Sequence, residues 1–243
     1  MGWIIGIIAA GLGLLLGKGS RQSTESLSMS GGYTVETWRP LITVLAEKSN
    51  PKLSVPYILK WIQLESGGNP CSIGQKINGP DGYPKELGIS QVYNPEDLKR
   101  FHITGKELRA YCKPGFSSQV SRPLTQEEMT IQARMTIDLV LHCLTESGRS
   151  LIANKIPWSP NSKDFWKAVK LWHALPVIVR PGFANVTKYL GRAPISWTEF
   201  RKTYEIIQPR AKFVPGKDKQ DGYYRALQIS EDTGNAFVGS LIV

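Results

Sequence analysis

The stretch ILKWIQLESGGNP, residues 58–70, carries the clearest structural signal in the chain. Its spacing places Ile58, Ile62 and Glu65 along one face of a helix, and a pair of glycines then ends that helix. A carboxylate in the last helical turn faces the negative end of the helix dipole, and partial burial acts in the same direction, so we expect a raised pKa for Glu65. A general acid needs such a pKa near neutral pH, which makes Glu65 the candidate catalytic residue.

The same periodicity continues on both sides of this helix. We expect helices over residues 34–49, 54–68, 96–101, 104–112, 125–147, 163–173 and 182–190. Residues 70–95 are rich in Gly, Pro and Asn, which indicates loops with a small β-hairpin near 77–93. We therefore expect a mainly helical α+β fold with a single globular domain over residues 33–203, followed by an irregular C-terminal tail over 204–243.

The chain begins with an uncharged apolar run, residues 1–17. As a helix this run would span about 26 Å, close to the thickness of a bilayer core, with Trp3 at one interface and Lys18 and Arg21 at the other. We expect a membrane-anchor helix, followed by a Ser/Gly-rich flexible linker over residues 18–32. A cleaved signal peptide and a helix buried in protein are the alternatives.

Composition and charge limit the classes of partner that the protein can be expected to bind. Of the 243 residues 41% are hydrophobic, which is enough to bury a core and excludes a wholly disordered chain. The formal net charge is +10, of which residues 33–203 carry +9, so the positive charge belongs to the globular part. Nucleic acid, anionic lipid and the anionic polymers of a bacterial wall are the partners that such a surface favours, and an ordinary soluble surface is the alternative.

The three cysteines are Cys71, Cys112 and Cys143, and an odd number leaves at least one thiol unpaired. None belongs to a CxxC pair and no histidine lies at ligand spacing from two of them, so we expect no metal site. The sequence holds no P-loop or dinucleotide fingerprint, and we expect no cofactor. A Cys71–Cys112 disulfide is compatible with the sequence, but we expect free buried thiols.

Two stretches together carry a resemblance to a known family. The run ILKWIQLESGGNP, followed after a gap by ELGISQVYNPEDL, resembles the soluble-type lytic transglycosylase domain of the lysozyme-like superfamily. That family has a helix ending in Glu-Ser, then Asn-Pro, then a Gly-Leu-Met-Gln motif, and the matching positions here are Glu65, Ser66, Asn69, Pro70, Gly88, Ile89, Ser90 and Gln91. A later Ala-Tyr-Asn-x-Gly motif has its nearest match in AVKLWHALP, with Trp172 and His173 at the Tyr and Asn positions. The resemblance covers roughly residues 35–190.

The resemblance implies a lyase that cuts peptidoglycan between N-acetylmuramic acid and N-acetylglucosamine. Glu65 would protonate the bridging oxygen, and the same carboxylate would then take the proton of the sugar's own C6 hydroxyl, which closes a 1,6-anhydro ring. The resemblance also implies a set of substrate-binding residues. Gly88 would let the backbone approach the sugar, and Ser66 and Gln91 would hydrogen-bond or orient it. The remaining residues would line the groove: Tyr83, Tyr93, Trp172 and His173.

This sequence departs from the family pattern at Ser90, where the family has Met, and at Trp172, where it has a Tyr whose hydroxyl touches the catalytic carboxyl. An indole offers only an N–H donor, and His173 titrates near neutral pH. These departures concern the level of activity and the substrate preference more than the fold.

Three alternatives stay open. The first is a hydrolytic lysozyme in which Asp81 or Glu86 activates water beside Glu65. The second is a structural virion protein of the same fold, without activity, that binds DNA or membrane. In the third, Glu65 is an ordinary glutamate at a helix end, solvated or paired with Lys60 or Lys85.

The expected partners are peptidoglycan glycan strands, the membrane through residues 1–17, and other virion or envelope proteins. We expect a membrane-anchored protein that acts in the periplasm or cell wall, and the divergence of its motifs favours a bacteriophage particle. The positive charges at Lys18 and Arg21 favour the opposite topology, with the globular part in the cytoplasm.

The anchor hypothesis has a direct test. We expect the full chain to stay in the membrane fraction, and a chain starting near Ser30 to be soluble without detergent and to fold normally, because the apolar run is the only part that needs lipid. Partition of the full chain into buffer, or a mature chain that begins after residue 20, would contradict the hypothesis.

Overall fold

The computed structural model describes residues 32–74, 77–79, 81–93 and 96–239, with the backbone alone for 176–180. The predicted anchor over residues 1–17 and all but the last residue of the predicted linker lie outside the described residues. Among the helices of the described part, none combines the length and the apolar character that a membrane crossing requires.

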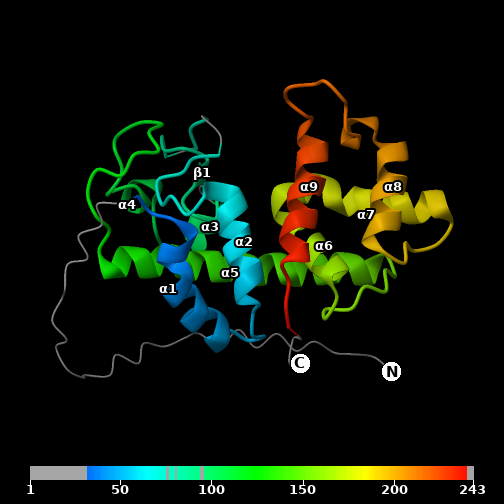
Figure 1. Cartoon of the computed structure of the whole chain (residues 1–243), viewed down its shortest axis with the longest axis horizontal. Helices are drawn as coiled ribbons and strands as arrows, with labels where there is room; N and C mark the ends of the chain where they lie inside the picture. The colour runs from blue at the N-terminus through cyan, green and yellow to red at the C-terminus, as the bar shows by residue number, and fades with distance from the viewer. Residues whose placement is uncertain (1–31, 75–76, 80, 94–95, 240–243) are drawn as a thin grey trace. The chain divides into compact units, whose positions relative to one another are not determined.

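The described chain is mainly helical, with one two-stranded antiparallel sheet (Figure 1). Its elements, in chain order, are α1 (Val35–Lys48), α2 (Val55–Ser66), β1 (Glu86–Leu87), β2 (Val92–Tyr93), α3 (Glu96–Arg100), α4 (Gly105–Leu108), α5 (Gln126–Ala153), α6 (Lys163–Ala174), α7 (Pro176–Leu190), α8 (Trp197–Ile207), the 3-10 helix η1 (Pro209–Ala211) and α9 (Gly222–Asn235).

The longest helix, α5, contacts α1, α2, α6 and α7, and Figure 1 shows it running horizontally from the side of α1 and α2 to the side of α6. Its start is fixed by a capping box, in which Thr125 Oγ1 accepts from Glu128 N and the Glu128 carboxylate accepts from Thr125 N. Farther along, the buried Ser147 Oγ donates to Ala168 O at 3.0 Å, which ties α5 to α6. α5 therefore links the N-terminal helices to the C-terminal ones.

The β-hairpin lies where the sequence predicted it. Glu86 pairs with Tyr93 and Leu87 with Val92, so residues 88–91 form the loop between the strands. These four residues are the Gly-Ile-Ser-Gln segment of the second motif, and all four are buried. The second motif is thus a tight turn that faces the protein interior.

α2 meets α1 at a position where only glycine fits. A Cβ atom at Gly68 would lie 2.3 Å from the carbonyl carbon of Thr34. The close approach also lets Trp38 Nε1 donate to Gly68 O at 2.7 Å, inside the core. Gly68, just beyond the end of α2, therefore lets the start of α1 pack against it.

The prediction of an irregular C-terminal tail over 204–243 is wrong. α8 runs across the expected boundary to Ile207, and α9 packs against α6 and α2. Beyond α9, Phe237 stacks on Trp166 with ring centroids 4.9 Å apart, and Val238 N donates to Ser54 Oγ at 3.1 Å. Buried side chains of α8, α9 and Phe237 are therefore part of the same hydrophobic core.

Small side chains explain why the sequence pattern of α9 is weak. The buried face of this helix includes Ala226, Ser230, Thr233 and Gly234, so it has few of the large apolar residues that mark an amphipathic helix. A Cβ atom at Gly234 would lie 2.3 Å from Lys167 Cγ. Small residues let α9 approach α6 closely, and close packing supplies the stability that large side chains supply elsewhere.

The role of the C-terminal segment is testable through Phe237. We expect Phe237→Ala to lower the free energy of unfolding by about 3 kcal/mol, because it removes a 94%-buried ring and leaves a cavity beside Trp166. Urea unfolding measures the change. Phe213→Ala is the matched control, since Phe213 is 57% exposed and its loss should cost well under about 1 kcal/mol. Equal effects of the two substitutions would contradict the assignment of Phe237 to the core.

Candidate functional site

Glu65 lies in the last turn of α2, where the sequence placed it. Pro56 stands in the first turn of this helix, and Gly67 ends it in the left-handed conformation at φ 64°, with its N–H donating to Gln63 O. Ile58 and Ile62 on the same face are fully buried, whereas the Glu65 side chain is 17% exposed. Glu65 thus stands at the solvent end of a buried helix face.

Ser66 joins the two motif segments. Its hydroxyl lies 2.8 Å from Ile89 O, to which it donates, and it accepts from Gly68 N at 3.1 Å. The carbonyl of Ile89 belongs to the hairpin turn, so this bond fixes the end of α2 against residues 88–91. The structure therefore brings Ser66, the neighbour of Glu65 in the chain, into contact with the turn of the second motif.

α6 brings two further titratable side chains to Glu65. Lys170 Nζ, which is fully buried, forms an ion pair with Glu65 Oε1, and His173 Nε2 lies 3.5 Å from the same oxygen. The two residues are three positions apart and so lie on one side of α6. Beneath them, the ring of Trp61 has its centroid 3.9 Å from Lys170 Nζ and 4.9 Å from the His173 ring. A carboxylate, an ammonium and an imidazole thus share one small volume.

The predicted rise of the Glu65 pKa is wrong. Burial is the largest single effect and raises the pKa of Glu65, but the charge of Lys170, the adjacent His173 and the hydrogen bond from Lys170 together outweigh burial, so the pKa lies below the ordinary value for Glu. Burial also lowers the pKa of Lys170, although Glu65 offsets part of that effect. In the free protein Glu65 is therefore a carboxylate at neutral pH.

Burial and the neighbouring Lys170 lower the pKa of His173 to about 3. His173 is consequently neutral at pH 7, and Lys170 is the cation that holds Glu65 in its ionised form. A neutral imidazole beside a carboxylate acts as a hydrogen-bond partner for a ligand or for Glu65 and not as a counter-ion.

Lys170 is the site residue that the sequence analysis missed. It replaces an apolar residue on the buried stripe of α6, between Trp166 and His173 at helical spacing. A charged side chain on such a stripe is the same signal that singled out Glu65. Trp172 is buried, at 6% exposure, and lies about 100° around the helix from His173 and about 200° from Lys170. The side of α6 that faces Glu65 is therefore the side of Lys170 and His173.

Gly88 and Gln91 have structural roles within the 88–91 turn. Gly88 has φ 78°, and a Cβ atom there would lie 2.5 Å from Gln132 Oε1, so the glycine serves a close approach to α5. Gln91, which is 4% exposed, donates from Nε2 to Gly88 O at 2.9 Å and closes the turn. Both residues position the segment to which Ser66 is bonded.

Tyr83 and Tyr93 lie on the loops beside the hairpin. Tyr83 lines a pocket of about 560 Å³, together with Asn78, Gly82, Pro84, Lys106, Arg109, Ala110, Cys112, Lys113, Pro114, Gly115 and Phe116. Lys85 Nζ lies 4.9 Å from the centroid of the Tyr93 ring, and Tyr93 N donates to Asp97 Oδ2. Neither tyrosine has a contact with Glu65 that places it in the ion-pair cluster.

Both carboxylate oxygens of Asp81 accept hydrogen bonds from backbone N–H groups. Its Oδ1 accepts from Tyr83 N at 3.0 Å and its Oδ2 from Gly105 N at 3.1 Å, so its carboxylate joins the loop to the start of α4. Glu86 lies in β1 with its carboxylate beside Gly74, where a Cβ atom would come within 1.9 Å of Glu86 Oε2. Asp81 thus has a structural task that accounts for both of its oxygens.

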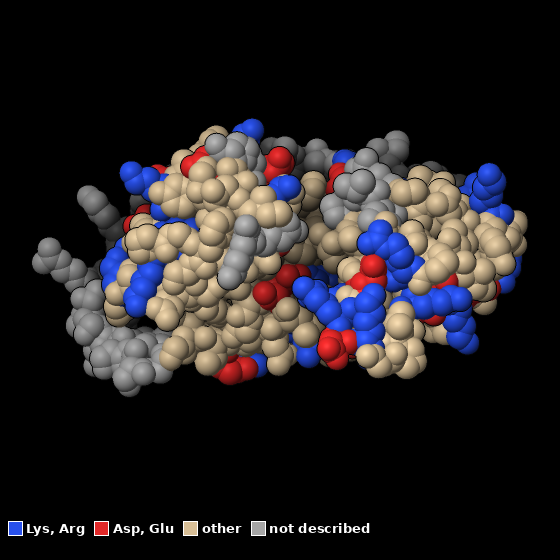
Figure 2. All heavy atoms as spheres, turned by 90° about the horizontal axis from the view of Figure 1, so that it is seen from above, with Lys and Arg blue, Asp and Glu red and all other residues tan. Residues whose placement is uncertain are grey.

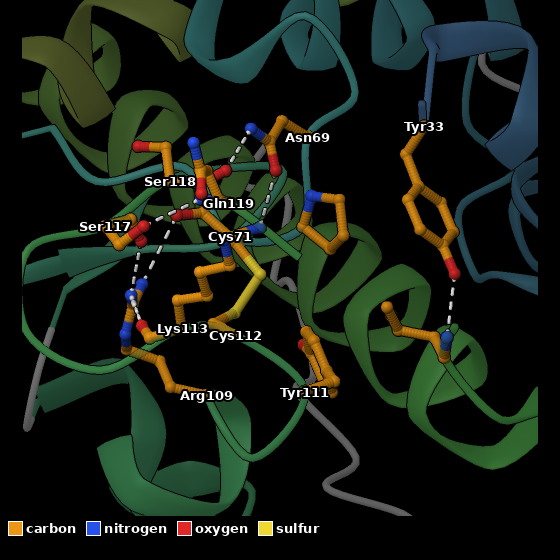
Figure 3. The surroundings of a disulfide bond; sticks show 12 residues. Tyr33, Asn69, Cys71, Arg109, Tyr111, Cys112, Lys113, Ser117, Ser118 and Gln119 are labelled. Atoms are coloured by element: carbon orange, nitrogen blue, oxygen red, sulfur yellow. Dashed lines mark hydrogen bonds between the residues drawn. A yellow bond between two sulfur atoms is a disulfide. The ribbon is translucent and has the colours of Figure 1, made fainter. Parts of the chain in front are cut away.

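The expectation of free thiols is wrong for two of the three cysteines. Cys71 and Cys112 form a disulfide (Figure 3). Cys143 is a free, buried cysteine. Beside the disulfide, the Arg109 guanidinium donates to the carbonyls of Cys71, Lys113, Gly115 and Ser117. The disulfide and Arg109 together fasten the loop that follows α2 to the segment that follows α4.

The surface near α8 and α9 carries charges of both signs. Figure 2 shows Lys and Arg side chains gathered on the side of α8 and α9, with acidic side chains among them. Three arginines there form ion pairs, Arg192 with Glu199, Arg201 with Glu231, and Arg210 with Asp221. This part of the surface therefore alternates in sign and does not present uninterrupted positive charge.

Comparison with known proteins assigns no family to the chain: no family model matches it, and neither a curated protein nor a solved structure is significantly similar.

The buried ion pair makes a prediction about stability and pH. Glu65→Gln leaves the Lys170 ammonium buried without its counter-charge, which should lower the free energy of unfolding at pH 7 by about 3 kcal/mol. The contribution of an acid with a lowered folded-state pKa is present above its unfolded pKa and is lost as the pH falls through the folded one. The deficit of Glu65→Gln relative to the wild type should therefore shrink on acidification below about pH 4.

Urea unfolding across this pH range measures the deficit. Glu36→Gln is the matched control, because Glu36 pairs with Arg39 on the surface, where water and salt screen the pair, so its loss should leave the free energy of unfolding nearly unchanged. Glu65→Gln combined with Lys170→Met should recover part of the loss at pH 7. A deficit that stays constant from pH 7 to pH 3 would mean that the pair does not stabilise the fold.

Proposed function

We propose that the chain is a peptidoglycan-cleaving lytic transglycosylase with a lysozyme-like domain and Glu65 as its general acid and base. One observation carries the proposal: Ser66 bonds the end of α2, which carries the partly exposed carboxylate of Glu65, to Ile89 in the 88–91 turn, so the two motifs meet in space. Juxtaposition of two segments more than twenty residues apart is what a built site requires, and chance matches in a sequence do not provide it.

The use of a single carboxyl favours the transglycosylase reaction over hydrolysis. A hydrolytic glycosidase needs a second carboxylate as base or nucleophile, and Asp81 is engaged with two backbone N–H groups. The C6 hydroxyl of the muramic acid is tethered to the reacting sugar, and this proximity replaces a second catalytic group. Glu65 would give a proton to the bridging oxygen and then accept the proton of O6 as the C1–O6 bond forms.

The disulfide supports the proposed location. Disulfides form and persist mainly in oxidising surroundings such as the periplasm or the cell exterior. The Cys71–Cys112 bond therefore favours a globular part outside the cytoplasm, against the topology that Lys18 and Arg21 suggest. We propose that residues 1–17 anchor the chain and that the domain acts on the wall in the periplasm or as part of a phage particle.

The ion pair also supports a second candidate function, binding of glycan strands without cleavage. A general acid must carry a proton, and Lys170 keeps Glu65 ionised in the free protein. In this alternative Glu65, Lys170 and His173 recognise the polar groups of a sugar, and the domain fixes a larger assembly to the wall.

The products of digestion separate these functions. We expect purified cell walls to release muropeptides that end in 1,6-anhydro-N-acetylmuramic acid, each lighter by one water molecule than the hydrolysis product, which mass spectrometry resolves. In folded Glu65→Gln protein the rate of muropeptide release should fall at least ~100-fold, because glutamine cannot donate a proton. Glu36→Gln should cleave at the wild-type rate.

Reducing ends in the products would replace the transglycosylase proposal with hydrolysis, and Glu86 would become the candidate for positioning water. Sedimentation with cell walls in the absence of any released muropeptide would identify the protein as a wall-binding module.

A further inference from the structure

The protonation state of Glu65 in the free protein differs from the state that the proposed reaction requires. Glu65 is ionised in the free protein, yet the reaction proposed above begins with a proton on Glu65. The ammonium directly bonded to its carboxylate belongs to Lys170, a side chain without exposed surface. A proton on Lys170 Nζ is therefore already aimed at Glu65 Oε1 and is shielded from solvent.

The surroundings of Lys170 limit its role. The titratable groups that act on it are Glu65 from α2 and the thiol of Cys143 from α5, and His173 is its neighbour on α6. Burial raises the pKa of Cys143 far above the usual range, and His173 is neutral, so neither competes for the proton at pH 7. The face of Trp61 fixes the ammonium in place, at 3.9 Å from the ring centroid.

We propose that Lys170 is a positioning residue that stores the proton of the catalytic acid: it transfers a proton from Nζ to Glu65 Oε1 when a sugar covers Glu65, and it recovers that proton after each turnover. The inference rests on the proposed function and adds the source of the proton to it.

Binding of the substrate would drive the proton transfer from Lys170 to Glu65. The 17% of the Glu65 side chain that is exposed is the route by which water stabilises the charge. A bound sugar excludes that water, and a drier site favours the neutral acid-amine pair over the ion pair, because charges without solvation are costly. Lys170 is already depleted of water, which lowers its pKa and prepares it to give up the proton.

The cycle balances. The proton moves from Lys170 to Glu65 and then to the bridging oxygen, as the bond from C1 to that oxygen breaks with its electron pair on oxygen. O6 then bonds to C1 and gives its proton to the Glu65 carboxylate, which returns it to the neutral amine of Lys170. The net change is the transfer of one proton from O6 to the leaving oxygen, with no other reactant.

Two substitutions at Lys170 separate proton storage from a structural ion pair. Lys170→Arg keeps the charge but cannot release a proton, and we expect its rate to fall at least ~100-fold at every pH. Lys170→Met removes the cation, so burial raises the pKa of Glu65, and Glu65 then carries its own proton under acidic conditions. This variant should cleave faster than Lys170→Arg at pH 5 and lose activity about tenfold per pH unit above the new pKa.

The rates are measured as 1,6-anhydro muropeptides released by the full chain in detergent, from pH 4 to pH 8. Lys167→Met is the matched control, since Lys167 is also a largely buried lysine of α6 but pairs with Asp164, and it should keep the wild-type pH profile. Circular dichroism shows whether each variant is folded. If Lys170→Arg does not fold, the pH profile of Lys170→Met decides, because it must lose its neutral-pH activity.

A Lys170→Arg enzyme with near-wild-type rate, or a Lys170→Met enzyme with an unchanged pH profile, would overturn the inference and leave the proposed function intact. A wild-type protein that releases no muropeptides would overturn the proposed function, and this inference with it. The two failures are thus distinguishable in one set of assays.

Discussion

The ion pair between Glu65 and Lys170 is the constraint on which the rest of the site depends. It joins the end of α2 to the middle of α6, and Lys170 has no exposed surface. Removing a charge from water is costly unless a partner is held in good geometry, so the two helices must meet in this register. Trp61 and His173 complete the arrangement from the same two helices.

The elements around this pair hold it in position. Ser66 fastens the end of α2 to the hairpin turn, and the disulfide with Arg109 fastens the neighbouring loops. On the other side, α6 is supported by α5 and by the closely packed α9, with Phe237 covering Trp166. A partly exposed carboxylate thus stands on a rigid frame, which is the condition for a precise binding or catalytic site.

The same arrangement explains why two functions fit the site. A carboxylate paired with a buried cation is a good recognition group and a poor proton donor in the free protein. Cleavage requires that the proton reach Glu65 when the sugar is bound, and the buried ammonium is placed to provide it. Under the two functions proposed above, the difference between cleavage and wall binding depends on the position of one proton, and exclusion of water would control it.

The sequence by itself determined the helices with strong apolar periodicity and the hairpin. These follow from local signals, namely caps, glycines and spacing, that act over a few residues. It did not determine α9, whose buried face is built of small residues, nor the pairing of Cys71 with Cys112. Above all, the dipole and burial of one helix predicted a raised pKa for Glu65, whereas the tertiary structure lowers it. The reason is that Lys170, 105 residues later in the chain, is brought to the carboxylate only when α6 packs against α2.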